Sequence, residues 1–150
     1  MKNATSTRLV FILLLFSFIS PMVSASFDVA ISASPMAQEA DADNPAEYSI
    51  TVSNTGDEDM TVNLGTSQDP SNCNGFTSNV EQISGTVDAG TSETVTLTVT
   101  VNDQANGDCE TTVTATANAV GTPGQPKTAD VTVTTTAGDG GGLNAVKLTV

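Results

Sequence analysis

Two groups of oxygen-bearing side chains are the places where this chain could do chemistry. They are Asp41, Asp43 and Asn44 in the first group, and Asp57 and Asp59 in the second. Carboxylate and amide oxygens are the ligands that Ca²⁺ takes in proteins, and a pair of carboxyl groups is the usual machinery of acid–base hydrolysis. These residues are therefore the candidates for a metal site or a catalytic site.

The pattern around these acids favours neither kind of site. The calcium-binding EF-hand loop needs a central Gly and a terminal Glu, and neither group has them at the required spacing. The two groups flank the predicted strand Tyr48–Asn54 and should lie at its opposite ends. The chain has no His and few aromatic residues to shape a pocket. We expect a protein that is not an enzyme, has no catalytic residue and needs no cofactor, with calcium binding as the less favoured alternative.

The stretch around the second group is typical of a hairpin tip. Alternating apolar and polar residues precede and follow it, and Gly56 stands between the two runs. Asp and Gly suit turn geometry, and solvent accepts the charge of exposed carboxylates. We therefore expect Gly56 to turn the chain and the acids after it to lie in water.

The charge balance excludes two classes of partner. The sequence of 150 residues has 17 Asp and Glu against 4 Lys and Arg, which is a formal net charge of −13. Lys2 and Arg8 precede the first apolar run, so Lys127 and Lys147 are the basic residues of the remaining chain. An acidic surface repels phosphate backbones and anionic lipid headgroups. We expect no nucleic-acid partner, and no membrane insertion once the leader is removed.

The first 25 residues are typical of an export signal. A basic start is followed by the apolar run Leu9–Ile19, then by Pro21, and then by small residues up to Ala25. The run is shorter than the roughly 20 apolar residues that span a bilayer comfortably. We predict a signal peptide over residues 1–25, cleavage after Ala25, and a secreted or cell-surface location. A retained anchor is the alternative.

Two cysteines, Cys73 and Cys109, follow this signal. An exported chain with two cysteines most simply forms one disulfide. Closing a loop of about 36 residues would stabilise the fold by roughly 4 kcal/mol in the chain-entropy model. The alternative is a reactive or metal-binding thiol pair, which the wide spacing and the absence of His disfavour. We predict the disulfide Cys73–Cys109.

Apolar and polar residues alternate with a period of two through most of the chain after residue 26. The expected strands are 27–33, 48–54, 60–64, two short edge strands within 76–87, then 92–101, 109–120 and 127–136. The segment 34–47 is predicted to be a polar loop. Seven to eight short strands with frequent turn signals predict an all-β fold, an immunoglobulin-like antiparallel β-sandwich over residues 26–137. A closed barrel is the alternative fold.

Residues 138–150 form a Gly-rich hinge and a final strand-like segment. The apolar residues of that segment are Leu143, Val146, Leu148 and Val150. We favour a strand that folds back onto its own domain. The segment could instead be lent to a neighbouring subunit as an assembly strand, or it could begin a further region.

Three motifs follow one another in this sequence. They are VSNTGD (Val52–Asp57), AGTSETVTLTV (Ala89–Val99) and the small-residue strand Thr111–Ala117. Their order resembles that in the immunoglobulin-like modules of prokaryotic surface and secreted proteins, of the NEW3 or CARDB-like cell-adhesion type. The resemblance implies an immunoglobulin-like fold with an adhesion, spacer or carbohydrate-associated role, and it transfers no catalytic residue.

These features together predict a non-enzymatic secreted or cell-surface module that acts by protein–protein contact. It would be an adhesion protein, or a structural or filament subunit. Its partners would be other surface proteins or copies of itself, with polysaccharide as a further alternative. The competing hypothesis is a small extracellular protein that binds carbohydrate or calcium.

Overall fold

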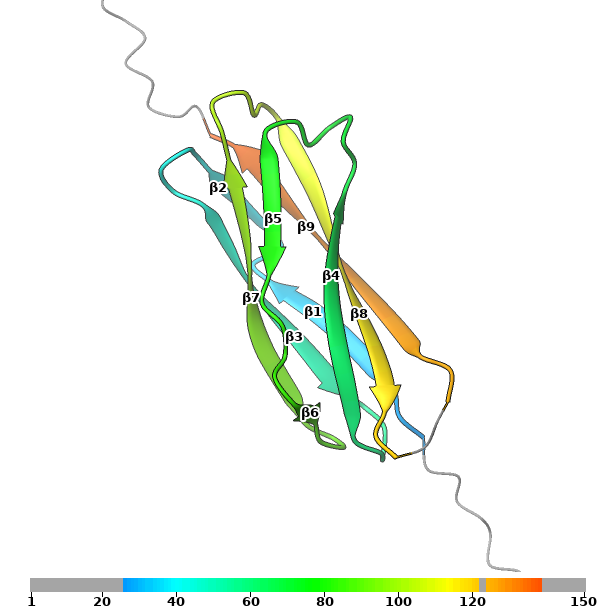
Figure 1. The fold of residues 1–150 in the computed structure, drawn as a ribbon. Coiled ribbons are helices and arrows are strands. Elements are labelled where there is room, and N and C mark those ends of the chain that lie inside the picture. The colour runs from blue at the N-terminus through cyan, green and yellow to red at the C-terminus, as the bar shows by residue number, and fades with distance from the viewer. Residues whose placement is uncertain (1–25, 122–123, 139–150) are drawn as a thin grey trace, which may run out of the picture.

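The computed structural model describes residues 26–121 and 124–138, which form nine β-strands in two sheets (Figure 1). The four-stranded sheet has the order β1 (Val29–Ser34), β3 (Ala46–Asn54), β7 (Ser92–Val101) and β5 (Phe76–Val80). The five-stranded sheet has the order β2 (Ala37–Ala40), β9 (Lys127–Ala137), β8 (Asp108–Ala119), β4 (Met60–Gln68) and β6 (Thr86–Val87). The predicted all-β two-sheet sandwich is confirmed.

The number of strands differs from the predicted seven to eight because the segment 34–47 is not only a loop. It contains β2, which pairs in parallel with the end of β9, Ala37 opposite Thr134. The other strand pairs of both sheets are antiparallel. The chain thus leaves one sheet after Ser34 and joins the edge of the other. Four residues with small or polar side chains show too little alternation to predict a strand.

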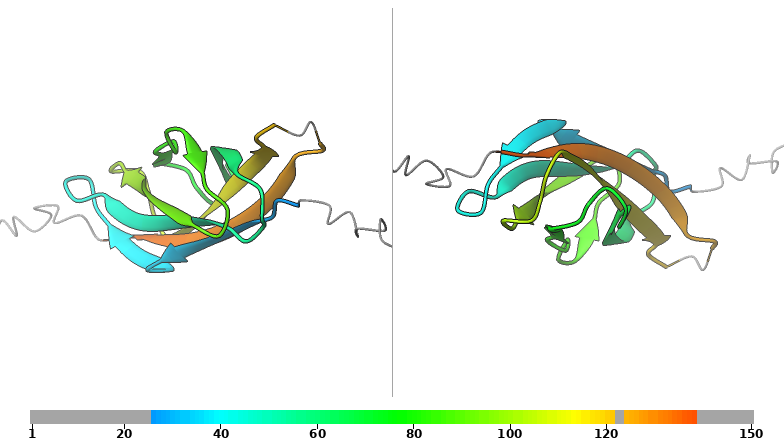
Figure 2. Two further views of the ribbon diagram at one scale, coloured as in Figure 1. Left: turned by 90° about the horizontal axis from the view of Figure 1, so that it is seen from below. Right: turned by 90° about the horizontal axis from the view of Figure 1, so that it is seen from above.

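The core lies between the inward faces of the two sheets, which curve around it in the end-on views of Figure 2. The alternation predicted for the long strands matches the observed burial, since most inward residues of β3, β7 and β8 are buried and Val95 of β7 is partly buried. The fully buried residues of these strands include Tyr48, Ile50 and Val52 in β3, Leu97 and Val99 in β7, and Val113, Ala115 and Ala117 in β8. Branched side chains suit this half-buried pleated surface.

Tyr48 links the two sheets through its hydroxyl group. Its ring is fully buried, and the hydroxyl donates to the carbonyl oxygen of Thr134 at 2.8 Å in β9. The Oγ1 atom of Thr135 also lies 2.8 Å from it. Burial raises the pKa of the Tyr48 phenol, and the hydrogen bond with Thr135 acts in the opposite direction more weakly.

Because the pKa of Tyr48 is raised in the folded state, we expect the fold to become less stable in alkali. The unfolded chain loses the phenol proton near its ordinary pKa of about 10, whereas the folded chain keeps the proton to higher pH. The free energy of unfolding should therefore fall as pH rises above about 10. Tyr48 is the one tyrosine and there is no Trp, so tyrosinate absorbance measures this pKa directly.

The matched variant is Tyr48→Phe, which keeps the ring and removes the titrating group. It should cost about 1 kcal/mol at neutral pH through the lost hydrogen bond. The alkaline loss of stability relative to neutral pH should become smaller than in the parent. A tyrosinate transition at the ordinary pKa in the folded protein would contradict the prediction.

Candidate functional site

The turn between β3 and β4, residues 54–59, carries the second acidic group, and the buried side chain of Asn54 organises it. The Asn54 amide donates to the carbonyl oxygens of Glu58 at 2.8 Å and Val87 at 3.1 Å. The side-chain oxygen Oδ1 of Asn54 accepts from the backbone N–H of Gly56 at 3.1 Å. A fully bonded buried amide of this kind holds the turn in one conformation.

Asp57 and Asp59 are exposed to solvent, as predicted, and each also accepts a hydrogen bond from a backbone nitrogen of a remote segment. Asp59 Oδ1 accepts from the backbone N–H of Ala89 at 2.9 Å, in the turn that precedes β7. Asp57 Oδ1 accepts from the backbone nitrogen of Ser26. Each carboxylate therefore ties the turn to a segment that is remote in the sequence, with a charge-assisted hydrogen bond.

Gly56 lies in the bend between β3 and β4, as predicted, and its missing side chain has a second consequence. Its φ is not positive, so the turn does not need Gly for its backbone conformation. A Cβ atom at Gly56 would lie 2.4 Å from the carbonyl oxygen of Ser26 and 2.5 Å from the Cα of Phe27. The N-terminal segment crosses directly over this glycine, because no side chain stands in its way.

The first acidic group is a closed hydrogen-bonded loop. Asp41 Oδ1 accepts from the N–H of Asp43 at 2.9 Å, and from the N–H and the Nδ2 of Asn44 at 2.8 and 2.9 Å. These bonds lower the pKa of Asp41, and the Asn44 side chain has the largest effect.

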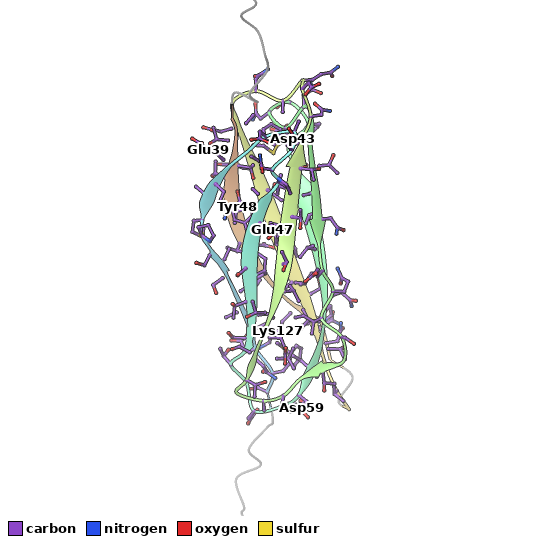
Figure 3. All side chains as sticks on the ribbon, turned by 90° about the vertical axis from the view of Figure 1, so that its left-hand side faces the viewer. Glu39, Asp43, Glu47, Tyr48, Asp59 and Lys127 are labelled. Carbon is purple, nitrogen blue, oxygen red and sulfur yellow. A yellow bond between two sulfur atoms is a disulfide. The ribbon has the colours of Figure 1, made fainter. Side chains whose placement is uncertain are left out.

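The two acidic groups lie at opposite ends of the sandwich, as Asp43 and Asp59 show in Figure 3. Over residues 26–121 and 124–138, no three His, Cys, Asp or Glu side chains gather where they could hold a metal ion. The first group of candidate calcium ligands, Asp41, Asp43 and Asn44, is thus not joined by the second, Asp57 and Asp59, in one site. The hydrogen bonds above give Asp41, Asp57 and Asp59 a role in holding turns.

The structure contains the predicted disulfide between Cys73 and Cys109, with the two Cα atoms 4.8 Å apart. Cys73 lies in the connection from β4 to β5, and Cys109 is the second residue of β8. Both residues are buried. The bond joins positions 36 residues apart and suggests an oxidising compartment outside the cytosol.

Two glutamine side chains close the seams between the sheets. Gln82 follows β5, and its amide exchanges two hydrogen bonds with Leu64 of β4: the Leu64 N–H donates at 3.0 Å and the Leu64 carbonyl accepts at 2.8 Å. Gln38 of β2 does the same to Glu47 of β3, at 3.1 and 2.8 Å. Each amide thus takes the place of a neighbouring strand residue. The sequence offered no signal for this, because a glutamine in a short polar stretch looks like any solvated residue.

Beyond Gln82, one side-chain hydrogen bond crosses the seam between β4 and β5, from Ser78 Oγ to Thr66 Oγ1 at 3.0 Å, and the backbone edges of the two strands stay unpaired there. Among the described residues, β6 pairs only with Met60 and Thr61 of β4, and no strand pairs with the outer edge of β5. The backbone N–H and carbonyl of Leu64 point away from β8. Because these groups alternate in direction along a strand, the backbone groups of Thr66 and Gln68, two and four residues further on, point away from β8 as well. Lys and Pro, which commonly guard such edges, are absent from both strands.

Comparisons with solved structures agree with this architecture. The chain is similar to the PapD-like domain 7 of human CEP192, an ASH / PapD-like domain, with a TM-score of 0.53 and 14% identity over 71% of this chain and 84% of that one. The fold is an immunoglobulin-like, PapD-like β-sandwich. No protein-family model matches the sequence, and no curated protein sequence matches it either.

Two further solved structures resemble this PapD-like sandwich at lower scores. Domains 4 and 5 of the S-layer protein SbsC give a TM-score of 0.45 and 16% identity, over 75% of this chain and 53% of that one. WR4, an MSP family member of C. elegans, gives 0.46 and 9%, over 72% and 97%.

Two predicted features lie outside the residues that the structure of this sandwich describes. They are the signal peptide, residues 1–25, and the assembly segment with Leu143, Val146, Leu148 and Val150. Within the described part, no helix is long and apolar enough to cross a membrane.

Proposed function

We propose that the protein is a non-enzymatic secreted or cell-surface module that acts by protein–protein contact, as a structural or adhesive subunit. The observation that carries the proposal is the open seam between β4 and β5, where two strand edges have no partner among the described residues. An open edge is a template for an added strand, which is a common way in which extracellular domains assemble. The sequence resemblance to cell-adhesion modules and the buried disulfide support an extracellular role.

The occupant that fits this seam best is the segment 143–150 of a second copy. It alternates apolar and polar residues over Val146, Leu148 and Val150, as a strand with one buried face requires. Its single charged side chain is Lys147, whereas the body it would meet has Lys127 as its one basic residue over 26–138. A basic strand and an acidic body attract each other.

In this proposal the incoming strand replaces Gln82. The Gln82 amide already forms the two hydrogen bonds to Leu64 that a neighbouring backbone would form. Its displacement therefore exchanges equivalent bonds, and pairing then extends to Thr66 and Gln68. Salt screens both the attraction at Lys147 and the repulsion between two strongly acidic copies. Because the repulsion involves many more charges, salt should on balance favour the contact.

The experiment is the mass in solution, by light scattering, of residues 26–150 and of a chain that ends at Gly138. We expect oligomers for the longer chain, more of them at high salt, and a monomer for the shorter chain. The described body keeps its pairing in both, since Gly138 still donates to the carbonyl of Ala40 at 2.8 Å. If both chains had the mass of a monomer, assembly through the segment would be contradicted.

A variant of the edge tests where the strand docks. Thr66→Pro removes an N–H that points away from β8, together with the hydroxyl that accepts from Ser78 Oγ. The fold should keep its β4–β8 ladder while the open edge is blocked. We expect the 26–150 chain with this change to stay folded by circular dichroism and to lose its oligomers. Unchanged oligomers in a folded variant would place the contact elsewhere.

A further inference from the structure

The first described residue, Ser26, is held by the body through both its backbone nitrogen and its carbonyl oxygen. The Ser26 nitrogen donates to Asp57 Oδ1, and the Ser26 carbonyl accepts from the Asp57 N–H at 2.8 Å. Two residues on, the carbonyl of Asp28 accepts from the N–H of Thr55 at 3.0 Å. The side chain of Phe27 between them is buried. This anchoring is possible because Gly56 lets the two backbones touch.

Ser26 is also the residue that follows the predicted cleavage point. Hydrolysis by a signal peptidase adds water across the Ala25–Ser26 peptide bond. Ala25 leaves with a carboxylate, and the nitrogen of Ser26 becomes an amine that takes up a proton at neutral pH. The atom that faces Asp57 thereby changes from a neutral amide to a cation.

We propose that Gly56 and Asp57 form a seat for the α-ammonium group of Ser26 that leader cleavage releases. Cleavage then converts a hydrogen bond between a neutral amide and the Asp57 carboxylate into an ion pair with that carboxylate, which is the stronger interaction. The other charged groups nearby are Asp28 and Lys127, which pair with each other at 3.3 Å, and the neighbouring acids Glu58 and Asp59. Removing the leader thus completes this end of the sandwich, whichever partner the protein binds.

The test compares two chains that differ by one residue. One begins at Ser26, and the other keeps Ala25, so its α-ammonium is moved one residue away from Asp57. Asp57→Asn is introduced into both, because the amide oxygen still accepts a hydrogen bond while the charge is gone. We expect this change to lower the folding equilibrium constant of the Ser26 chain about fivefold, and that of the Ala25 chain about twofold or less.

Asp43→Asn is the matched control, since it removes the same charge at the other end of the sandwich. It should alter the two chains equally. The full precursor, exported from a bacterial host, should give a mature product whose first residue by mass spectrometry is Ser26. Equal effects of Asp57→Asn in the two chains, or a mature chain that begins elsewhere, would overturn the proposal.

Discussion

Replacing Cys73 and Cys109 together by Ala should lower the free energy of unfolding by about 4 kcal/mol, the value of the chain-entropy model for this loop. The bond closes a loop of 36 residues that contains β5, β6 and β7. Without it, the unfolded chain regains the freedom that the closed loop denies it. The measurement is equilibrium unfolding in urea, in which the slope against denaturant should also rise because the unfolded state expands.

The parent protein with its disulfide reduced is the control for this variant. Both forms lack the cross-link, so their unfolding midpoints should agree to within the small cost of trimming two buried sulfur atoms. Replacing both cysteines leaves no free thiol that could pair with another chain. A loss below about 1 kcal/mol in the free energy of unfolding would show that closing this loop stabilises the fold only slightly, contrary to the entropic argument.

The strands were predictable from the sequence wherever one face of a sheet is buried. In β3, β7 and β8 the apolar residues recur at every second position, because successive side chains of a strand point to opposite faces. The disulfide was predictable because a chain with two cysteines and a predicted export signal allows one pairing. Both features can be read from the types of the residues and their spacing along the chain.

The features that stayed hidden depend on contacts between remote segments. The side-chain amides of Gln38 and Gln82 form the hydrogen bonds of a neighbouring strand only because the fold brings an unpaired backbone residue opposite each amide. β2 exists because β9 offers it an edge, and its own residues hardly alternate. The roles of Asp57 and Asp59 as acceptors for Ser26 and Ala89 are likewise absent from local pattern.

Gly56→Ala should strongly destabilise this protein. The new Cβ would lie 2.4 to 2.7 Å from three atoms of the N-terminal segment, and all three are backbone atoms that no rotamer can move away. The segment must lift off, which exposes Phe27 and breaks the hydrogen bonds to Thr55 and Asp57. We expect a loss of about 2–4 kcal/mol in the free energy of unfolding.

Gly65→Ala is the matched control for that prediction. A Cβ at Gly65 meets nothing within 4 Å, and its φ is not in the positive range that favours Gly. In β4 an Ala should be neutral or stabilise by about 0.5 kcal/mol, because it restricts the unfolded chain more than Gly does. If chemical denaturation gave the two variants the same stability, the close approach at Gly56 would not be what holds the N-terminal segment in place.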